Sequence, residues 1–552
     1  MRRNRSSCLG LLPLIVHLSL FAVAKPDATP VREADATCAR CHAQIVRSYL
    51  ATPMANASGE ATQKLRPVTY LHPPSGVTYT IATSDGQATL SASDPRFPAE
   101  PVRRKLSYFL GSGHLGVTYL YFIRDALFES PVAWYAASGS YDMKPGLGEM
   151  RRMPPAIPAE SACLRCHMSA VQAGLPGTLN RYRDLPFLHG GITCEACHGD
   201  SAPHVRSAGK APIVNPARLD ADARDSVCIS CHLEGDVTVQ RAAKSVLNYQ
   251  PGQSISTYLA FYIRSKADPR ARGVSEVEQL SQSTCKRMSG DKMSCMSCHD
   301  PHFTPGPDQR IAFYRSKCLA CHAQPAFAAS HHPETPDCTS CHMRRTGAEN
   351  IPHVAWTDHR ILRLPDTQTS AADQAASGEL QPIFSPGTTQ RDLAMAEYQL
   401  LLEGDRSFET TAWNLFSQLK DSIADDKAAL DAWGTLSAER GDFPSAEAAF
   451  RRVLVLDPVD LTALSNLGTL RAKQGNLAES AQLLGKAFDN NNDIAGLAMN
   501  LARVECAQGD ARAAQGTLES ALVYSPDLED LRRLRDQVKD KPEDCSASAK
   551  KQ

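Results

Sequence analysis

The sequence lacks an excess of charge of one sign, and after its first residues it lacks any long apolar run. Among its 552 residues, 59 Lys and Arg side chains stand against 60 Asp and Glu side chains. A balanced charge argues against nucleic acid or an anionic membrane surface as a partner, because both attract basic proteins. A membrane helix needs about 20 apolar residues, and no later segment offers them. We therefore expect no nucleic-acid partner and no membrane span in the mature chain.

Cysteine, in contrast, is abundant and regularly spaced. All but four of the 18 cysteines stand in copies of a Cys-x-x-Cys-His motif, which we number 1 to 7 in chain order. The cysteine pairs are Cys38 and Cys41, Cys163 and Cys166, Cys194 and Cys197, Cys228 and Cys231, Cys295 and Cys298, Cys318 and Cys321, and Cys338 and Cys341. The histidines that follow them are His42, His167, His198, His232, His299, His322 and His342.

This motif is the attachment site of a c-type haem. Its two thiols can form thioether links to the vinyl groups of one porphyrin, and the adjacent imidazole can ligate the iron. Zinc ribbons, thioredoxin-like dithiols and iron-sulfur sites also use Cys-x-x-Cys, but none of them requires the histidine that follows every pair here. We predict seven covalently bound haem c groups.

The N-terminus predicts export. Arg2, Arg3 and Arg5 precede an apolar run over 9–23, and the run ends in small residues before Ala24. This order is typical of a cleavable signal peptide over 1–24, and an uncleaved anchor is the alternative. Haem c is attached outside the cytoplasm, so we expect the mature protein in a bacterial periplasm.

The remaining chain divides into regions of different composition. We expect a multihaem domain over 25–363, in which six motifs lie too close together for an ordinary hydrophobic core, so that the porphyrins themselves form the core. Within it, segments such as 68–71, 77–81, 116–122 and 132–135 are rich in β-branched and aromatic residues beside turn formers. They predict a small β-rich insertion over about 60–160.

The C-terminal part repeats itself. Gly441, Gly475 and Gly509 are spaced by 34 residues, which is the period of tetratricopeptide repeats, and an unrelated helical bundle is the alternative. We expect a linker over 364–390, a repeat domain over 391–540 and a polar tail over 541–552. The predicted fold class is mainly α: a haem-cored cytochrome domain with a β-rich insertion, followed by an α-solenoid.

Three phrases around the motifs carry a family resemblance: GITCEACHG at 191–199, MSCMSCHDPH at 293–302, and CTSCHM at 338–343 followed by DHRI at 358–361. Residues 36–362 resemble the cytochrome c-554-like multihaem proteins, in the broader group that holds pentahaem nitrite reductases and hydroxylamine oxidoreductases. The resemblance implies a mostly helical scaffold with closely stacked porphyrins, and many members carry a tetratricopeptide array. The Cys-x-x-Cys-Lys motif of the nitrite reductases does not occur here.

The second axial ligands decide between electron transfer and catalysis, because an iron with two imidazoles is saturated. Nine histidines remain after the signal and the motifs: His72, His114, His189, His204, His302, His331, His332, His353 and His359. The resemblance implies distal ligation by His204, His302 and His359, with His353 and His189 next. His72 is expected to be exposed. Met54, placed where relatives often show histidine, is either a thioether ligand or a core residue.

Three cysteines beyond the motifs and the signal are Cys285, Cys506 and Cys545. In an oxidising compartment Cys506 and Cys545 could pair. The function that we expect is a periplasmic electron carrier whose seven haems form a wire and whose repeats bind a redox partner protein. The alternatives are a multihaem oxidoreductase acting on a small nitrogen or sulfur compound at a five-coordinate haem, and a repeat-based assembly scaffold. Whether the protein is an enzyme is therefore left open.

Overall fold

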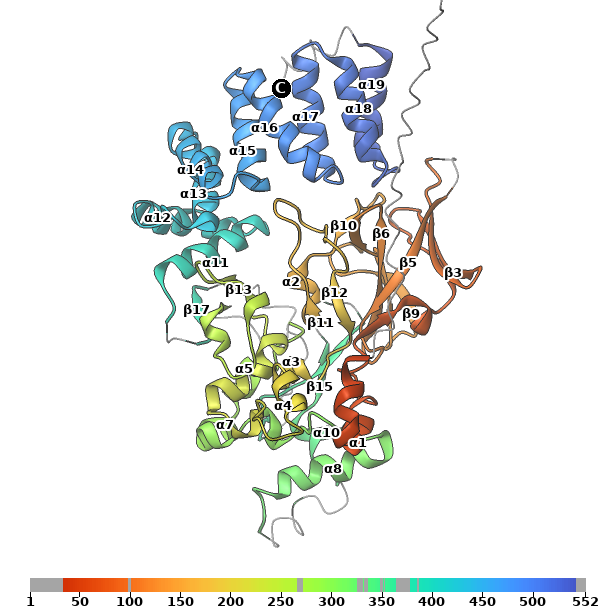
Figure 1. The fold of residues 1–552 in the computed structure, drawn as a ribbon, viewed down its shortest axis with the longest axis vertical. Coiled ribbons are helices and arrows are strands. Elements are labelled where there is room, and N and C mark those ends of the chain that lie inside the picture. The colour runs from red at the N-terminus through yellow and green to blue at the C-terminus, as the bar shows by residue number, and fades with distance from the viewer. Residues whose placement is uncertain are drawn as a thin grey trace, which may run out of the picture.

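The computed structural model describes residues 33–97, 101–265, 272–324, 331, 336–347, 351, 353–363, 378–384 and 387–542. Three parts are visible along the long axis (Figure 1): a sheet at the right, a loop-rich part with short helices at the bottom, and a helical array that arches over the top. The prediction of a mainly α fold was too narrow, because a ten-stranded sheet accounts for much of the N-terminal part. All seven motifs lie before residue 343, outside the helical array.

The ten-stranded sheet is antiparallel and has the order β10-β7-β6-β5-β4-β3-β2, with β1 beside β5 and with β8 between β6 and β9. Its strands are β1 (Ser58–Glu60), β2 (Val68–Leu71), β3 (Thr78–Ser84), β4 (Gln87–Ser93), β5 (Val102–Leu110), β6 (Gly116–Ile123), β7 (Ala126–Glu129), β8 (Val132–Tyr135), β9 (Ser140–Met143) and β10 (Ile157–Pro158). They occupy the region where the sequence predicts β-hairpins. Alternating side chains such as Tyr79, Ile81 and Tyr119 are buried in one core, as expected for strands with one covered face.

The loop-rich part carries all seven motifs and has little conventional core. Its helices are α1 (Ala36–Tyr49), α2 (Ser161–Leu164), α3 (Glu195–His198), α4 (Ala202–Arg206), α5 (Ala221–His232), α6 (Glu276–Gln282), α7 (Thr284–Ser289), α8 (Pro307–Leu319) and α10 (Cys338–His342). Its small sheets pair β11 (Met168–Val171) with β12 (Phe187–Gly190), β13 (Val237–Gln240) with β14 (Leu259–Arg264), and β15 (Arg345–Gly347) with β16 (Ala355–Thr357). Among the described residues between Tyr262 and Val354, no hydrophobic side chain is buried.

The array confirms the predicted tetratricopeptide architecture. Its helices are α11 (Gln390–Leu402), α12 (Glu409–Leu419), α13 (Lys427–Glu439), α14 (Phe443–Leu456), α15 (Leu461–Lys473), α16 (Leu477–Asn490), α17 (Ala495–Ala507), α18 (Ala511–Leu522) and α19 (Glu529–Asp540). Asp442 and Asn476 cap the second helices of successive pairs by accepting backbone N–H bonds. A Cβ at Gly434 would lie 2.6 Å from the Phe450 ring, so glycine permits the close helix crossing there.

The array contacts the rest of the chain at both of its ends. At the first end, β17 (Leu380–Pro382) pairs with β14, and α11 shares a core with β13 and β14 through Ala396 and Leu400. The expected linker at 364–390 therefore contains a strand at 380–382. At the far end, Tyr524 lies in the core of the ten-stranded sheet. Among the described residues, no helix is both long and apolar enough to cross a membrane.

Candidate haem sites

The motifs are shaped as single helical turns. Motifs 1, 4 and 7 lie within α1, α5 and α10, and motif 3 lies at α3. In the others a backbone bond closes the turn: His299 N–H donates to Cys295 O at 2.9 Å, and His322 N–H donates to Cys318 O at 3.0 Å. One turn brings both cysteines to the same side of the backbone, as attachment to one porphyrin requires. All fourteen motif cysteines are free thiols.

Four motif histidines face a second imidazole across a similar gap. The centres of the rings are 6.5 Å apart for His42 and His204, 5.9 Å for His198 and His302, 6.2 Å for His299 and His359, and 6.0 Å for His342 and His331. The angles between the ring planes are 17°, 8°, 31° and 22° in the same order. When two imidazoles bind one metal from opposite sides, each metal–nitrogen bond is about 2 Å long and each nitrogen lies about 1 Å from the centre of its ring. The two ring centres are then roughly 6 Å apart. The donor set and its spacing therefore fit a haem iron.

Backbone carbonyl groups orient these rings. Nδ1 of His198 lies 2.8 Å from Val214 O, and Nδ1 of His342 lies 2.6 Å from Leu362 O. The same contact is made by Nδ1 of His204 with Ala211 O at 2.7 Å, and by Nδ1 of His359 with Thr357 O at 2.8 Å. A ring that donates from Nδ1 keeps Nε2 for a metal, and such contacts fix the tautomer of metal-binding histidines.

The surroundings of three of the histidines favour the neutral form of the imidazole. Burial lowers the pKa of His299 to about 4, with further contributions from His359 and His232. Burial also lowers the pKa of His302 and of His167. A neutral imidazole is the form that binds a metal.

Thiols of different motifs lie near one another. The side chains of Cys38 and Cys194 interact electrostatically, as do those of Cys166 and Cys231. The same holds for Cys228 with Cys295 and for Cys318 with Cys338. Cys197 also lies near Cys231, and Cys298 lies near Cys321. These proximities make motif 1 a neighbour of motif 3, motif 3 of motif 4, motif 2 of motif 4, motif 4 of motif 5, motif 5 of motif 6 and motif 6 of motif 7.

Polar bonds support these adjacencies independently of the thiols. The backbone N–H of Cys194 donates to Asp35 Oδ1 at 3.0 Å, which ties motif 3 to the start of α1. Arg165, inside motif 2, donates to the carbonyl of Ser230, inside motif 4. Arg224 of α5 donates to Asp291 O at 3.1 Å, just before motif 5. In the same way, Arg315 of α8 donates to Pro336 O at 3.3 Å and so connects motifs 6 and 7.

Other candidate ligands lie elsewhere. His353 Nε2 is 2.7 Å from Asp142 Oδ2 on β9, and its ring packs against Tyr135 of the ten-stranded sheet. His189 lies on β12, opposite Ser169 in the hairpin that follows motif 2. The expectation that His72 is exposed was wrong: it is 2 % exposed because its ring nitrogens contact Ser75 Oγ and Gly148 O.

Three further expectations have a place in the structure. The carbonyl of Met54 accepts a bond from Ile192 N–H at 3.0 Å, so the segment around Met54 packs beside motif 3. Cys506 is disulfide-bonded, and Cys545 lies outside the described residues. Cys285 is a free thiol on α7. His332 also lies outside the described residues.

A cavity of about 300 Å3 opens beside His359. Its lining includes Arg310, Arg345 and His114, together with Glu276 and aromatic Trp356. Guanidinium groups bind carboxylates well. The two arginines would therefore suit the propionate groups of a haem whose iron His359 would ligate.

Comparison with known families agrees with this chemistry. Residues 141–199 match the family described as cytochrome c554 and c-prime, residues 288–327 match the doubled CXXCH motif, and residues 432–493 match the tetratricopeptide repeat. These matches are those of c-type cytochromes with several haem-binding motifs. More particularly, the chain resembles the multihaem cytochromes of the c554 group and carries a C-terminal tetratricopeptide repeat domain.

Solved structures were also compared. The outer cell wall cytochrome OcwA is 14% identical over 83% of this chain and 99% of its own, with a TM-score of 0.36. A structure of the MamA protein is 17% identical over 29% of this chain and 87% of its own, with a TM-score of 0.25. At these TM-scores neither likeness supports an argument about function. No curated protein matches the chain.

Proposed function

We propose that the protein is a periplasmic seven-haem electron carrier. The observation that supports this most strongly is that each motif lies near another, with polar bonds between several of them, because covalent attachment places each porphyrin at its own motif. Neighbouring motifs in contact would carry neighbouring haems, and electrons could pass along them. The predicted signal peptide and the chemistry of haem c attachment support the periplasmic location.

The contacts favour a branched path. Motifs 1, 3, 4, 5, 6 and 7 follow one another, and motif 2 joins at motif 4 through the contact of Cys166 with Cys231. Motif 4 then has three neighbours, whereas motif 2 has one. The haem of motif 4 would be the junction of the path.

The proposed distal ligands support transfer rather than catalysis at three of the haems. His204 would complete the iron of motif 1, His302 that of motif 3, and His359 that of motif 5. Two imidazoles occupy both axial positions of a haem iron, so that the iron can transfer electrons but cannot bind a substrate. The contacts of His353 with Asp142 and Tyr135 favour a structural role in place of ligation.

The number of haems and the branching can be tested together. The intact mass of the secreted protein should exceed that of the polypeptide by seven haem units, and five or fewer would contradict the proposal. Charges on adjacent haems interact, so loss of one haem shifts the potentials of its neighbours. In a redox titration, removal of motif 4 by Cys228→Ala with Cys231→Ala should shift the reduction potentials of three haems. Removal of motif 2 by Cys163→Ala with Cys166→Ala is the matched control and should shift the reduction potential of one haem.

A second function is favoured by one difference among the motifs. Among the described residues, no imidazole ring contact is formed by His167 or His232, unlike the four paired motif histidines. A five-coordinate haem at motif 2 or motif 4 would support reduction or oxidation of a small nitrogen or sulfur compound. A high-spin signal in the oxidised protein that is lost with motif 2 or motif 4 would favour the enzyme, and its absence would favour the carrier.

The repeat domain is proposed to bind a redox partner protein. Stacked helix pairs offer an extended surface for another chain. To test this role, residues on the exposed face of the array are substituted. The rate of reduction by a purified partner protein is then compared with the rate of reduction by a small artificial donor.

A further inference from the structure

His331 stands opposite the histidine of motif 7. It lies between α8 and α10, and the centre of its ring is 6.0 Å from that of His342, with 22° between the ring planes. The sequence offers no motif around His331, and the resemblance implies no role for it. Its place in the fold singles it out.

The geometry of this pair matches that of the three pairs proposed above. Their ring separations run from 5.9 to 6.5 Å and their interplanar angles from 8° to 31°, so His331 with His342 falls inside both ranges. The roughly 6 Å expected for two imidazoles on one metal also agrees with it. The pair therefore has the spacing of axial ligands.

Motif 7 is also prepared to receive a second ligand. Nδ1 of His342 contacts Leu362 O at 2.6 Å, which leaves Nε2 to the iron. The side chain of Asp337 caps α10 by accepting N–H bonds from Thr339 and Ser340. The turn that holds Cys338, Cys341 and His342 is thus fixed in orientation.

We propose that His331 is the distal axial ligand of the haem iron at motif 7. The proposal rests on the proposed attachment of a haem to that motif. The ligand would come from the same short stretch of chain as the motif, whereas His204, His302 and His359 reach their irons from distant segments. A short loop costs less entropy to close than a long one, so His331 would reach its iron at a smaller entropic cost than the other three distal ligands.

The direct test is His331→Ala in the full secreted chain, read by electron paramagnetic resonance and by the visible spectrum of the oxidised protein. One haem in seven should change from low spin to high spin, and added imidazole should restore the low-spin signal because it refills the vacated position. His332→Ala is the matched control, with the same residue type one position on. If His332→Ala produces the change and His331→Ala does not, the proposal is wrong.

A double variant identifies which iron His331 serves. In a chain without motif 7 (Cys338→Ala with Cys341→Ala), adding His331→Ala should leave the spectrum of the remaining haems unchanged. In a chain without motif 6 (Cys318→Ala with Cys321→Ala), His331→Ala should still convert one haem. The reverse pattern would assign His331 to motif 6 and overturn the proposal.

The haem count separates this proposal from the one on which it rests. If the wild-type mass lacks the haem of motif 7, the proposed function fails at that site. If seven haems are present and His331→Ala leaves every haem low spin, the proposed function stands and the ligand assignment fails.

Discussion

Arg181 joins the haem-binding part to the repeat array, and its loss should loosen that junction. Its guanidinium group donates to Asn490 O at 2.5 Å, to Asn492 Oδ1 at 2.7 Å and to Asp493 Oδ1 at 2.8 Å. Asp125, on the sheet side, lies 3.3 Å away. The Arg181 and Asp493 side chains are 8% and 2% exposed. Arg181→Ala would therefore leave a buried carboxylate without its main cation.

Breaking a buried ion pair by removing one partner costs about 3–5 kcal/mol. Because 1.4 kcal/mol corresponds to a tenfold change in an equilibrium constant, local opening at the junction should become at least about a hundredfold more frequent. Hydrogen exchange measured by mass spectrometry reads such opening amide by amide. We expect faster exchange around Asn490 and Asp493 in Arg181→Ala, while the haem spectrum stays unchanged.

Arg152→Ala is the matched control at the same junction. Arg152 is 51% exposed and lies 3.4 Å from Glu529 and 3.7 Å from Asp530. Exposed pairs of this kind contribute up to about 1 kcal/mol. If Arg181→Ala opens the junction no more than Arg152→Ala does, the buried pair does not hold the two parts together and the reasoning is refuted.

Three other changes test separate features. Gly191 lies just ahead of motif 3, its φ is +66°, and a Cβ there would lie 2.1 Å from the carbonyl oxygen of Ala55. Gly191→Ala should therefore lower the haem content in a pyridine haemochrome assay, and a full haem count would contradict this. Burial, with nearby Asp460, raises the pKa of Asp431 to about 8, so the folded array keeps a proton that the unfolded chain loses. The free energy of unfolding should therefore fall between about pH 4 and pH 8, by up to about 1.4 kcal/mol per pH unit. The thermal midpoint of the helical signal should fall with it, and Asp431→Asn should flatten that slope. A chain ending at Arg363 should keep its haems yet unfold at lower urea concentration, because it loses β17 and α11 from a shared core; an unchanged midpoint would mean that the array contributes no stability.

Features encoded by local spacing could be predicted from the sequence. The motif turns follow from residues three and four positions apart, and the array follows from a 34-residue period whose glycines and caps recur. The β-hairpins follow from alternating apolar residues around turn formers such as Asp85 and Gly86, which have φ values of +52° and +73° and join β3 to β4.

Features that depend on distant contacts could not be predicted in this way. No spacing rule brings Cys166 beside Cys231 or ties motif 2 to the fourth. His331 gave no signal because no phrase around it resembles a known ligand position, and only the folded chain places it opposite His342. His353 was a candidate ligand through the family resemblance, and its contact with Asp142 of β9 is another distant contact that the sequence does not indicate.

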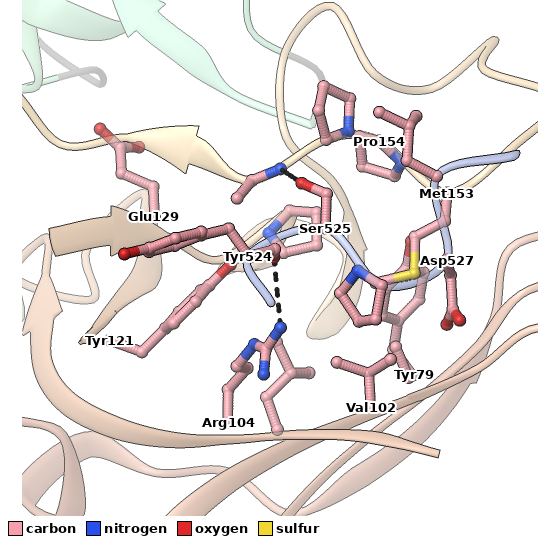
Figure 2. A pocket seen from close by; sticks show the side chains of 17 residues that line it. Tyr79, Val102, Arg104, Tyr121, Glu129, Met153, Pro154, Tyr524, Ser525 and Asp527 are labelled. Atoms are coloured by element: carbon pink, nitrogen blue, oxygen red, sulfur yellow. Dashed lines mark hydrogen bonds between the residues drawn. The ribbon is translucent and has the colours of Figure 1, made fainter. Parts of the chain in front are cut away.

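The far end of the array also completes the ten-stranded sheet. Figure 2 shows Tyr524 and Ser525 among side chains of the sheet, with Arg104 donating to Tyr524 O at 3.2 Å and Ala156 N–H donating to Ser525 Oγ at 3.2 Å. Tyr524 is 3% exposed and packs near Phe128, with ring centres 6.0 Å apart. Such burial resembles a core more than a transient contact.

These contacts constrain how a redox partner could use the repeats. The loops that carry Val459 and Asn491 face the haem-binding part, because a Cβ at Gly177 would lie 2.5 Å from Val459 O and Asn491 Nδ2 donates to Gly177 O at 2.6 Å. The loop that carries Tyr524 faces the ten-stranded sheet. That edge of the array is already covered by the chain itself. A partner must therefore bind the helix faces that these loops leave open, and it would then be held at a fixed position relative to the motifs, because the array is attached at both ends. A fixed position favours transfer to one particular haem, since electron transfer requires close approach of the two redox groups. The array would in this way select the entry point of the electrons as well as the protein that delivers them.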